Sequence, residues 1–213
     1  MKIKSLMSIG VSCGALFFMK GLDLRIPGPV DNLDGGNLLS TVKLLNGEFY
    51  NSIINKTYTF DNEKPDWGEY PTCRFTGFNM FHNDFHLEKT QNELMKRYNN
   101  LLEYLEKAKE DKEMFFVLAH NCADVYLTNN DITNIFNSIP EYIQDRLIIV
   151  GEQWLESGVD PKNYPDIPTH PQYFVDISIL RRFDNTSLLK EDFKKWWIKN
   201  KKFYEERNNC QYE

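Results

Sequence analysis

The sequence predicts an α/β fold in which a mostly parallel central sheet is flanked by helices. Short, uninterrupted apolar runs alternate with longer amphipathic segments, a pattern typical of strands buried between two layers of helices. The chain has 213 residues, of which 41% are apolar and 14% aromatic, so it can bury one full core. No internal repeat or low-complexity linker divides it. We therefore expect a single α/β domain over residues 1–213.

The N-terminal part predicts a strand, a tight turn and a helix. Apolar residues dominate Ile3–Ile9, as in a buried central strand, and an apolar helix follows over Cys13–Leu22, with Gly21 as its end signal. The next segment, Arg25–Gly36, is rich in Pro, Gly, Asp and Asn and predicts a loop. Because it follows the Cys13 helix directly, this loop is a candidate for one wall of a site at that helix. Apolar residues at helical spacing predict a short helix over Leu38–Leu45.

The least regular segment is an aromatic-rich insertion over about residues 49–84. Its alternation of aromatic and polar residues, as in Phe75-Thr76-Gly77-Phe78, favours short strands or hairpins over helix. After it, apolar residues recur at 3.6 spacing and predict a long amphipathic helix over Leu87–Glu110. The later predicted elements are a strand over Met114–Ala119, a helix over Asn130–Ser138, strands over Leu147–Val150 and Tyr173–Ile179, and a helix over Ser187–Tyr204.

Charge and motif content exclude several classes of function. The formal net charge of −6 argues against a general nucleic-acid binder. Four cysteines without C-x-x-C spacing offer no zinc ribbon or dithiol motif, and they indicate free thiols in the cytoplasm. The sequence contains no Walker motif, no G-x-G-x-x-G and no metal-ligand cluster, so we expect no cofactor. No apolar run approaches the ~18 residues of a membrane-spanning helix, so we expect no integral membrane segment.

Cys13 is the candidate thiol nucleophile. At a helix start, unpaired N–H groups and the positive end of the helix dipole favour thiolate over thiol. A catalytic thiolate also needs a histidine base and a polar group that orients the histidine. His82 lies between aromatic residues just before the long helix, and His120 follows the strand over Met114–Ala119. The other candidates are His86 and His170 as base, and Asp31, Asp84, Asn121 and Asp124 as the orienting group.

The segment before Cys13 has a competing interpretation. Two lysines and a short apolar stretch resemble a signal peptide, in which Cys13 would be lipidated. The apolar stretch is interrupted by Ser8 and Gly10 and continues past the cysteine, which suits a core helix better.

Two blocks of the sequence resemble a known family. The first block is Ser8-Ile9-Gly10-Val11-Ser12-Cys13, a helix closing on Gly21-Leu22-Asp23-Leu24-Arg25, and Pro29-Val30-Asp31-Asn32. The second is Phe81-His82-Asn83-Asp84-Phe85, followed by a helix and an apolar strand. In this order, over about residues 3–120, they resemble an uncharacterised, largely bacterial family grouped with the papain-like cysteine peptidases. That family shows a Ser-Leu-Gly-x-x-Cys turn, a helix closing on Gly-Leu-Arg, and the motifs Pro-Phe-Asp-Trp and Phe-x-His-Asp-Phe.

The resemblance implies a hydrolase or an acyl/amide transferase that acts on a small-molecule or peptide-like substrate. It implies Cys13 as the nucleophile, His82 as the base and Asp31 as the third catalytic residue. The sequence departs from the family pattern at Val30 and Asn32, which replace phenylalanine and tryptophan, and at an asparagine inserted after His82. Because of these departures, the identity of the third catalytic residue and of the substrate is less closely tied to the family pattern than Cys13 and His82 are.

Two alternatives remain. Ser12, with Asp166 and His170 late in the chain, loosely resembles an SGNH-type serine esterase or acyltransferase, although the spacing is Asp-x-x-x-His and Gly-Asp-Ser is missing. The other alternative is a non-enzymatic interaction protein, because lysines lie beside two tryptophans in the C-terminal helix. These are Lys194, Lys195, Lys199, Lys201 and Lys202. We expect the aromatic side chains to dock on the sheet and the lysines to form the solvated face.

Overall fold

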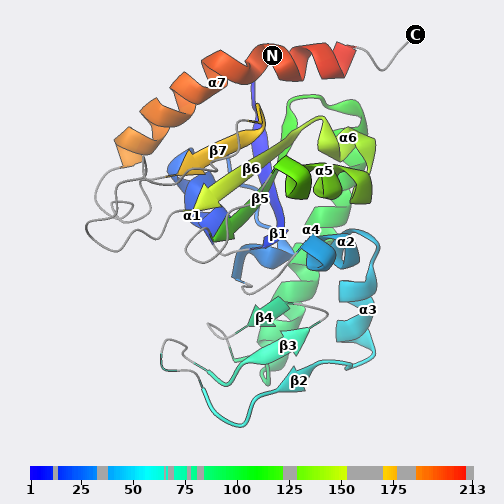
Figure 1. Ribbon diagram of the computed structural model, residues 1–213. Helices are drawn as coiled ribbons and strands as arrows, with labels where there is room; N and C mark the ends of the chain where they lie inside the picture. The colour runs from blue at the N-terminus through cyan, green and yellow to red at the C-terminus, as the bar shows by residue number, and fades with distance from the viewer. Residues whose placement is uncertain are drawn as a thin grey trace.

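The centre of the molecule is a four-stranded parallel sheet with the strand order β1-β5-β6-β7 (Figure 1). The structure, a computed structural model, describes residues 1–11, 14–32, 38–64, 66, 70–75, 78–80, 84–121, 129–152, 170–176 and 186–209. The strands are β1 (Ser5–Val11), β5 (Met114–Asn121), β6 (Leu147–Glu152) and β7 (Tyr173–Asp176). The predicted α/β class and the mostly parallel central sheet are confirmed.

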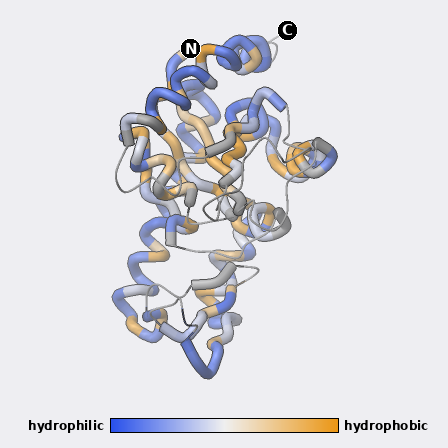
Figure 2. The backbone as a smooth tube through the Cα atoms, turned by 60° about the vertical axis from the view of Figure 1, so that its left-hand side comes forward, coloured by the Kyte–Doolittle hydropathy of each residue, from blue (hydrophilic) through white to orange (hydrophobic). Residues whose placement is uncertain are grey.

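Helices cover both faces of the sheet. The alternation along β5 shows the division, because Phe115 and Val117 belong to one buried cluster and Phe116 and Leu118 to another. The first cluster packs under α1 (Gly14–Gly21) and α7 (Thr186–Asn209). The second packs under α2 (Leu38–Leu45), α4 (Glu88–Glu110), α5 (Asn129–Ser138) and α6 (Glu141–Gln144). Figure 2 shows hydrophobic residues concentrated along the central strands.

The insertion begins with a helix, which differs from the expectation for residues 49–84. α3 covers Glu48–Ile54, and its Phe49, Ser52 and Ile53 are buried. Their spacing places them on one helix face, so the aromatic content reflects burial and not strand structure there. The rest of the insertion contains the expected short strands, in a three-stranded antiparallel sheet of order β2-β3-β4. They are β2 (Thr59–Phe60), β3 (Cys73–Phe75) and β4 (Phe78–Met80).

An aromatic cluster connects this small sheet to the rest of the molecule. Phe75 and Phe85 meet edge to face with ring centroids 4.7 Å apart, and Phe49 lies 6.3 Å from Tyr98 of α4. All four belong to the same buried cluster as the α4-facing side chains of β1 and β5. Figure 1 shows α4 extending from the central sheet to the small sheet. The small sheet is therefore anchored to the main core through α4.

The aromatic face of α7 docks on the central sheet, as predicted. Trp196 Nε1 donates a hydrogen bond to the carbonyl of Tyr173 at 3.0 Å, and the Tyr204 hydroxyl donates to that of Leu147 at 3.0 Å. Tyr204 is fully buried. The exposed positions of the helix include all five lysines between 194 and 202.

Candidate functional site

The carboxyl ends of β1, β5, β6 and β7 lie at one edge of the sheet because all four strands are parallel. Sheets of this kind bind ligands beyond the carboxyl ends of their strands. β1 ends at Val11 and α1 begins at Gly14, which confirms the predicted strand followed by a helix. Cys13 and Ser12 lie between these bounds in the sequence and outside the described residues.

A β-bulge lies just before this edge. Ser8 pairs with Val117 and Gly10 with Leu118, so Ile9 is an extra residue in β1. Gly10 has a φ of 136°, a conformation that side-chain-bearing residues rarely adopt. The bulge therefore depends on glycine at position 10, and bulges commonly redirect a strand next to functional sites.

His120 is the histidine whose backbone lies beside the end of β1. Val11 pairs with Ala119 of the neighbouring strand β5, so His120 comes one position beyond the last paired residue of β1. His120 itself pairs with Gly151 of β6. Neighbouring strands are about 4.8 Å apart, so its backbone lies next to the point where the chain leaves β1. Asn121, a candidate orienting residue, closes β5.

Asp31 is buried next to β1. It lies in the short 3₁₀ helix η1 (Pro29–Asn32), which contacts both β1 and α1. Its Oδ2 accepts hydrogen bonds from Arg25 Nε at 3.1 Å, Arg25 Nη2 at 2.7 Å and the Gly28 N–H at 3.1 Å. Burial raises the pKa of the Asp31 carboxyl, and the hydrogen bond and charge of Arg25 oppose that rise. These contacts fasten η1 in place.

Arg25 also belongs to this site, although the sequence analysis assigned it no catalytic or structural role. Leu6 and Arg25 form an isolated parallel bridge on the free edge of β1. The chain then runs toward the carboxyl edge, where a Cβ on Gly28 would lie 3.4 Å from the carbonyl of Ser8. The available signal was the position of Arg25 at the end of the Gly21-Leu22-Asp23-Leu24-Arg25 motif in the first family-like block. Within the described residues 25–32, the segment that was predicted to form a site wall thus runs beside β1 to its carboxyl half.

In the second family-like block and the residue that follows it, the described side chains stabilise the turn before α4. His86 is exposed and stacks on Phe60, with ring centroids 3.9 Å apart. Its backbone N–H donates to Asp84 Oδ1 at 3.0 Å, so this carboxylate stabilises the turn before α4. His82 lies outside the described residues, between β4 and Asp84 in the sequence.

His170 lies three residues before β7, far from the end of β1. β1 and β7 are separated by two intervening strands, which corresponds to about 14 Å. The His170 ring packs between Phe136 and Phe203, and its Nδ1 accepts the Gln172 N–H at 3.3 Å. Burial, together with the charge of Arg207, lowers its pKa. Ser12 lies outside the described residues, so the Ser12–His170 alternative stays a prediction. Asp166, the third member of that alternative, and Asp124 lie outside the described residues.

Cys73 has the properties of an inert thiol. It is fully buried in β3, and this burial raises the pKa of its thiol to about 12. Cys122 and Cys210 lie outside the described residues. In the part of the chain that the structure describes, no group of three His, Cys, Asp or Glu side chains is arranged to hold a metal ion.

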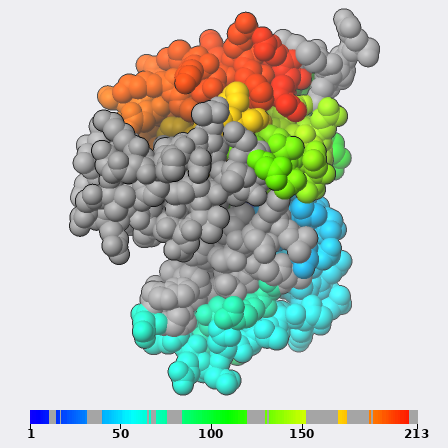
Figure 3. All heavy atoms as spheres, in the orientation of Figure 1, coloured from blue at the N-terminus to red at the C-terminus, as the bar shows by residue number. Residues whose placement is uncertain are grey.

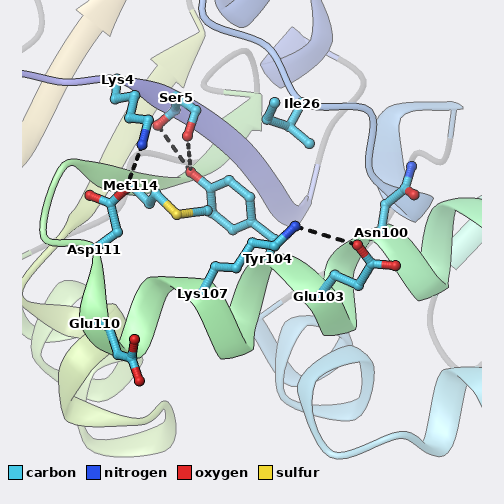
Figure 4. A pocket seen from close by; sticks show the side chains of 10 residues that line it. All are labelled: Lys4, Ser5, Ile26, Asn100, Glu103, Tyr104, Lys107, Glu110, Asp111 and Met114. Atoms are coloured by element: carbon cyan, nitrogen blue, oxygen red, sulfur yellow. Dashed lines mark hydrogen bonds and ion pairs between the residues drawn. The ribbon is translucent and has the colours of Figure 1, made fainter.

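A cleft of about 670 Å³ lies at the opposite, amino edge of the sheet (Figure 4). Four of its charged side chains form two pairs, Lys4 with Asp111 at 2.8 Å and Lys107 with Glu103 at 3.5 Å. The Tyr104 hydroxyl lies 2.8 Å from the carbonyl of Phe115. Asp31, the predicted catalytic residue that the structure describes, is not among the residues that line this cleft.

Comparisons of the chain with protein-family models, curated proteins and solved structures find no match. No helix within the described ranges combines the length and the apolar character that are needed to cross a bilayer.

Proposed function

We propose that this chain is a cysteine-dependent hydrolase or acyl/amide transferase with Cys13 as its nucleophile. The observation that carries the proposal is the end of β1 at Val11 and the start of α1 at Gly14, at the edge where all four parallel strands end. The N–H groups of the first turn of such a helix stabilise a nearby thiolate. The bulge at Gly10 gives additional support, because it reshapes β1 beside this edge.

Two histidines are candidates for the base. His82 is the base that the resemblance to the papain-like family implies. His120 is the base that the register of β5 favours, because its backbone is adjacent to the end of β1. Asp31 remains our choice for the orienting residue, since η1 borders the same strand. The Arg25–Asp31 ion pair joins two of the family-like motifs, which supports a common role for that segment.

The proposed reaction has two halves. The histidine accepts the proton of the Cys13 thiol, and the sulfur forms a bond to the carbonyl carbon of the substrate. Backbone N–H groups of the turn stabilise the oxyanion, the bond to the leaving group breaks, and the histidine returns the proton to that group. Water or another acceptor then gives its proton to the histidine and attacks the thioester carbon, the carbon–sulfur bond breaks, and the histidine returns the proton to the Cys13 sulfur.

The substrate is proposed to be a small molecule or a peptide-like chain, and the reaction requires no cofactor. We place the protein in the cytoplasm, where free thiols persist.

The test is iodoacetamide labelling as a function of pH, with each cysteine mapped by mass spectrometry. We expect Cys13 to react well below the ordinary thiol pKa of about 8.5. Cys73 is an internal reference because its burial raises the pKa of its thiol to about 12. Either His82→Asn or His120→Asn is expected to move Cys13 labelling toward pH ~8.5 and so to identify the base.

His86→Asn is the matched control, because His86 is exposed and stacks on Phe60 at the surface. It is expected to leave the labelling profile unchanged. If Cys13 labels only near the ordinary thiol pKa, and no faster than Cys210, the proposal is wrong. Reaction of Ser12 with a fluorophosphonate probe would favour the serine esterase alternative instead.

A further inference from the structure

The outward face of α7 carries an exposed isoleucine surrounded by lysines. Ile198 is 62% exposed, the highest value among the large apolar side chains of the described residues. Positions i±3 and i±4 are the nearest neighbours on a helix surface. For Ile198 these positions are Lys194, Lys195, Lys201 and Lys202, and all four are exposed. We call these five residues the basic face.

The positive charge of the basic face is weakly compensated. Lys195 lies 3.4 Å from Asp192 and Lys202 lies 3.5 Å from Glu206, and the lysine side chains of these pairs are 75% and 83% exposed. Exposed ion pairs of this kind contribute little free energy. Lys194 and Lys201 form no ion pair with any residue that the structure describes. The pKa of Glu205, one turn further along the helix than Lys201, is lowered by a hydrogen bond from the N-terminal amine and further by the charge of Lys201. The basic face is therefore a local positive patch on a chain whose formal net charge is −6.

The orientation of the basic face is determined by the opposite side of the helix. Tyr204 and Trp196 are hydrogen-bonded to carbonyls of the central sheet, and Arg207 Nε donates to the buried Asp145 at 2.6 Å. α7 lies along the outer edge of the molecule in Figures 1 and 3. The lysines and Ile198 consequently face outward together.

We propose that the basic face docks on the surface of an anionic lipid bilayer, with α7 parallel to the membrane plane. The four lysines contact lipid phosphates and headgroups, and Ile198 enters the boundary with the acyl chains. This pattern fits a membrane better than a nucleic acid, because phosphate contacts in a duplex do not require an apolar side chain at their centre. The aromatic rings that could stack on bases are docked inward. The proposal is independent of the cysteine chemistry.

The test is co-sedimentation of the full chain with vesicles of phosphatidylcholine, alone or with about 30 mol% phosphatidylserine. We expect binding to the anionic vesicles only. A lysine near an anionic surface contributes about fivefold to partitioning. The variant K194Q/K195Q/K201Q/K202Q is therefore expected to bind about 600-fold more weakly, and Ile198→Ser several-fold more weakly.

The matched control is K64Q/K89Q/K96Q/K107Q, which changes the net charge equally at exposed lysines away from α7. It is expected to bind like the wild type, and circular dichroism verifies that each variant folds. Equal sedimentation with neutral and anionic vesicles would overturn the proposal, as would wild-type binding by the α7 variant. So would tighter binding of a duplex DNA oligonucleotide than of the anionic vesicles at the same salt concentration.

Discussion

Replacing Arg25 by methionine tests whether the ion pair with Asp31 holds the segment beside β1. The Asp31 side chain is completely buried, whereas that of Arg25 is 23% exposed. Removing one partner of a buried pair costs about 3–5 kcal/mol of stability. Because Arg25 keeps partial contact with water, we expect about 2–3 kcal/mol for Arg25→Met. For a chain of this size that corresponds to a decrease in Tm of roughly 5–10 °C.

The stability that Arg25→Met loses should depend on pH, and the raised pKa of Asp31 determines the direction of that dependence. A carboxyl whose folded-state pKa is raised contributes stability below its unfolded pKa and loses it as the pH rises through the folded value. Burial already raises the pKa of Asp31, and Arg25 opposes that rise. Without Arg25 the folded-state pKa rises further, so Arg25→Met should be most destabilising at neutral pH and less so in acid.

The measurement is urea unfolding of the wild type, Arg25→Met and the double variant R25M/D31N at about pH 7.5 and about pH 5. Asparagine retains an oxygen that can accept the Gly28 N–H and removes the buried charge. We expect the double variant to be more stable than Arg25→Met at the higher pH. If the two substitutions are simply additive, or if the effect of Arg25→Met grows in acid, the buried ion pair does not act as described.

Three further predictions concern interactions elsewhere in the fold. A Cβ on Gly21 would lie 2.6 Å from Leu189 Cδ2, so Gly21→Ala should cost about 1–2 kcal/mol in urea unfolding, and much less in a Leu189→Ala background. Because burial lowers the pKa of His170, its neutral form stabilises the fold above about pH 6.5 and this contribution is lost in acid; His170→Asn should flatten the decrease in stability below that pH. Tyr104→Phe removes a hydroxyl that bonds to carbonyls of β1 and β5, and should lower the free energy of unfolding by about 1 kcal/mol; an unchanged urea midpoint would contradict it.

The sequence alone determined the class of fold and most of its elements. Buried strands and amphipathic helices have different apolar periods, and these periods are local properties that a single sequence displays. The helix over Leu38–Leu45 was predicted with the observed bounds, and the long helix was displaced by one residue at its start. The candidate chemistry also came from the sequence, through Cys13 at a strand–helix turn and the family-like blocks around Asp31 and His82.

Only the tertiary structure decided which distant residues meet. The neighbouring positions of β1 and His120 follow from strand register, and the Arg25–Asp31 pair follows from a bridge on the free edge of β1. α3 was missed because seven residues provide too few turns for a periodic signal in an aromatic-rich stretch. The lysines of α7 were visible in the sequence. It was the docking of the opposite face on the sheet that oriented them outward around Ile198, because packing and not local pattern selects the exposed side of a helix.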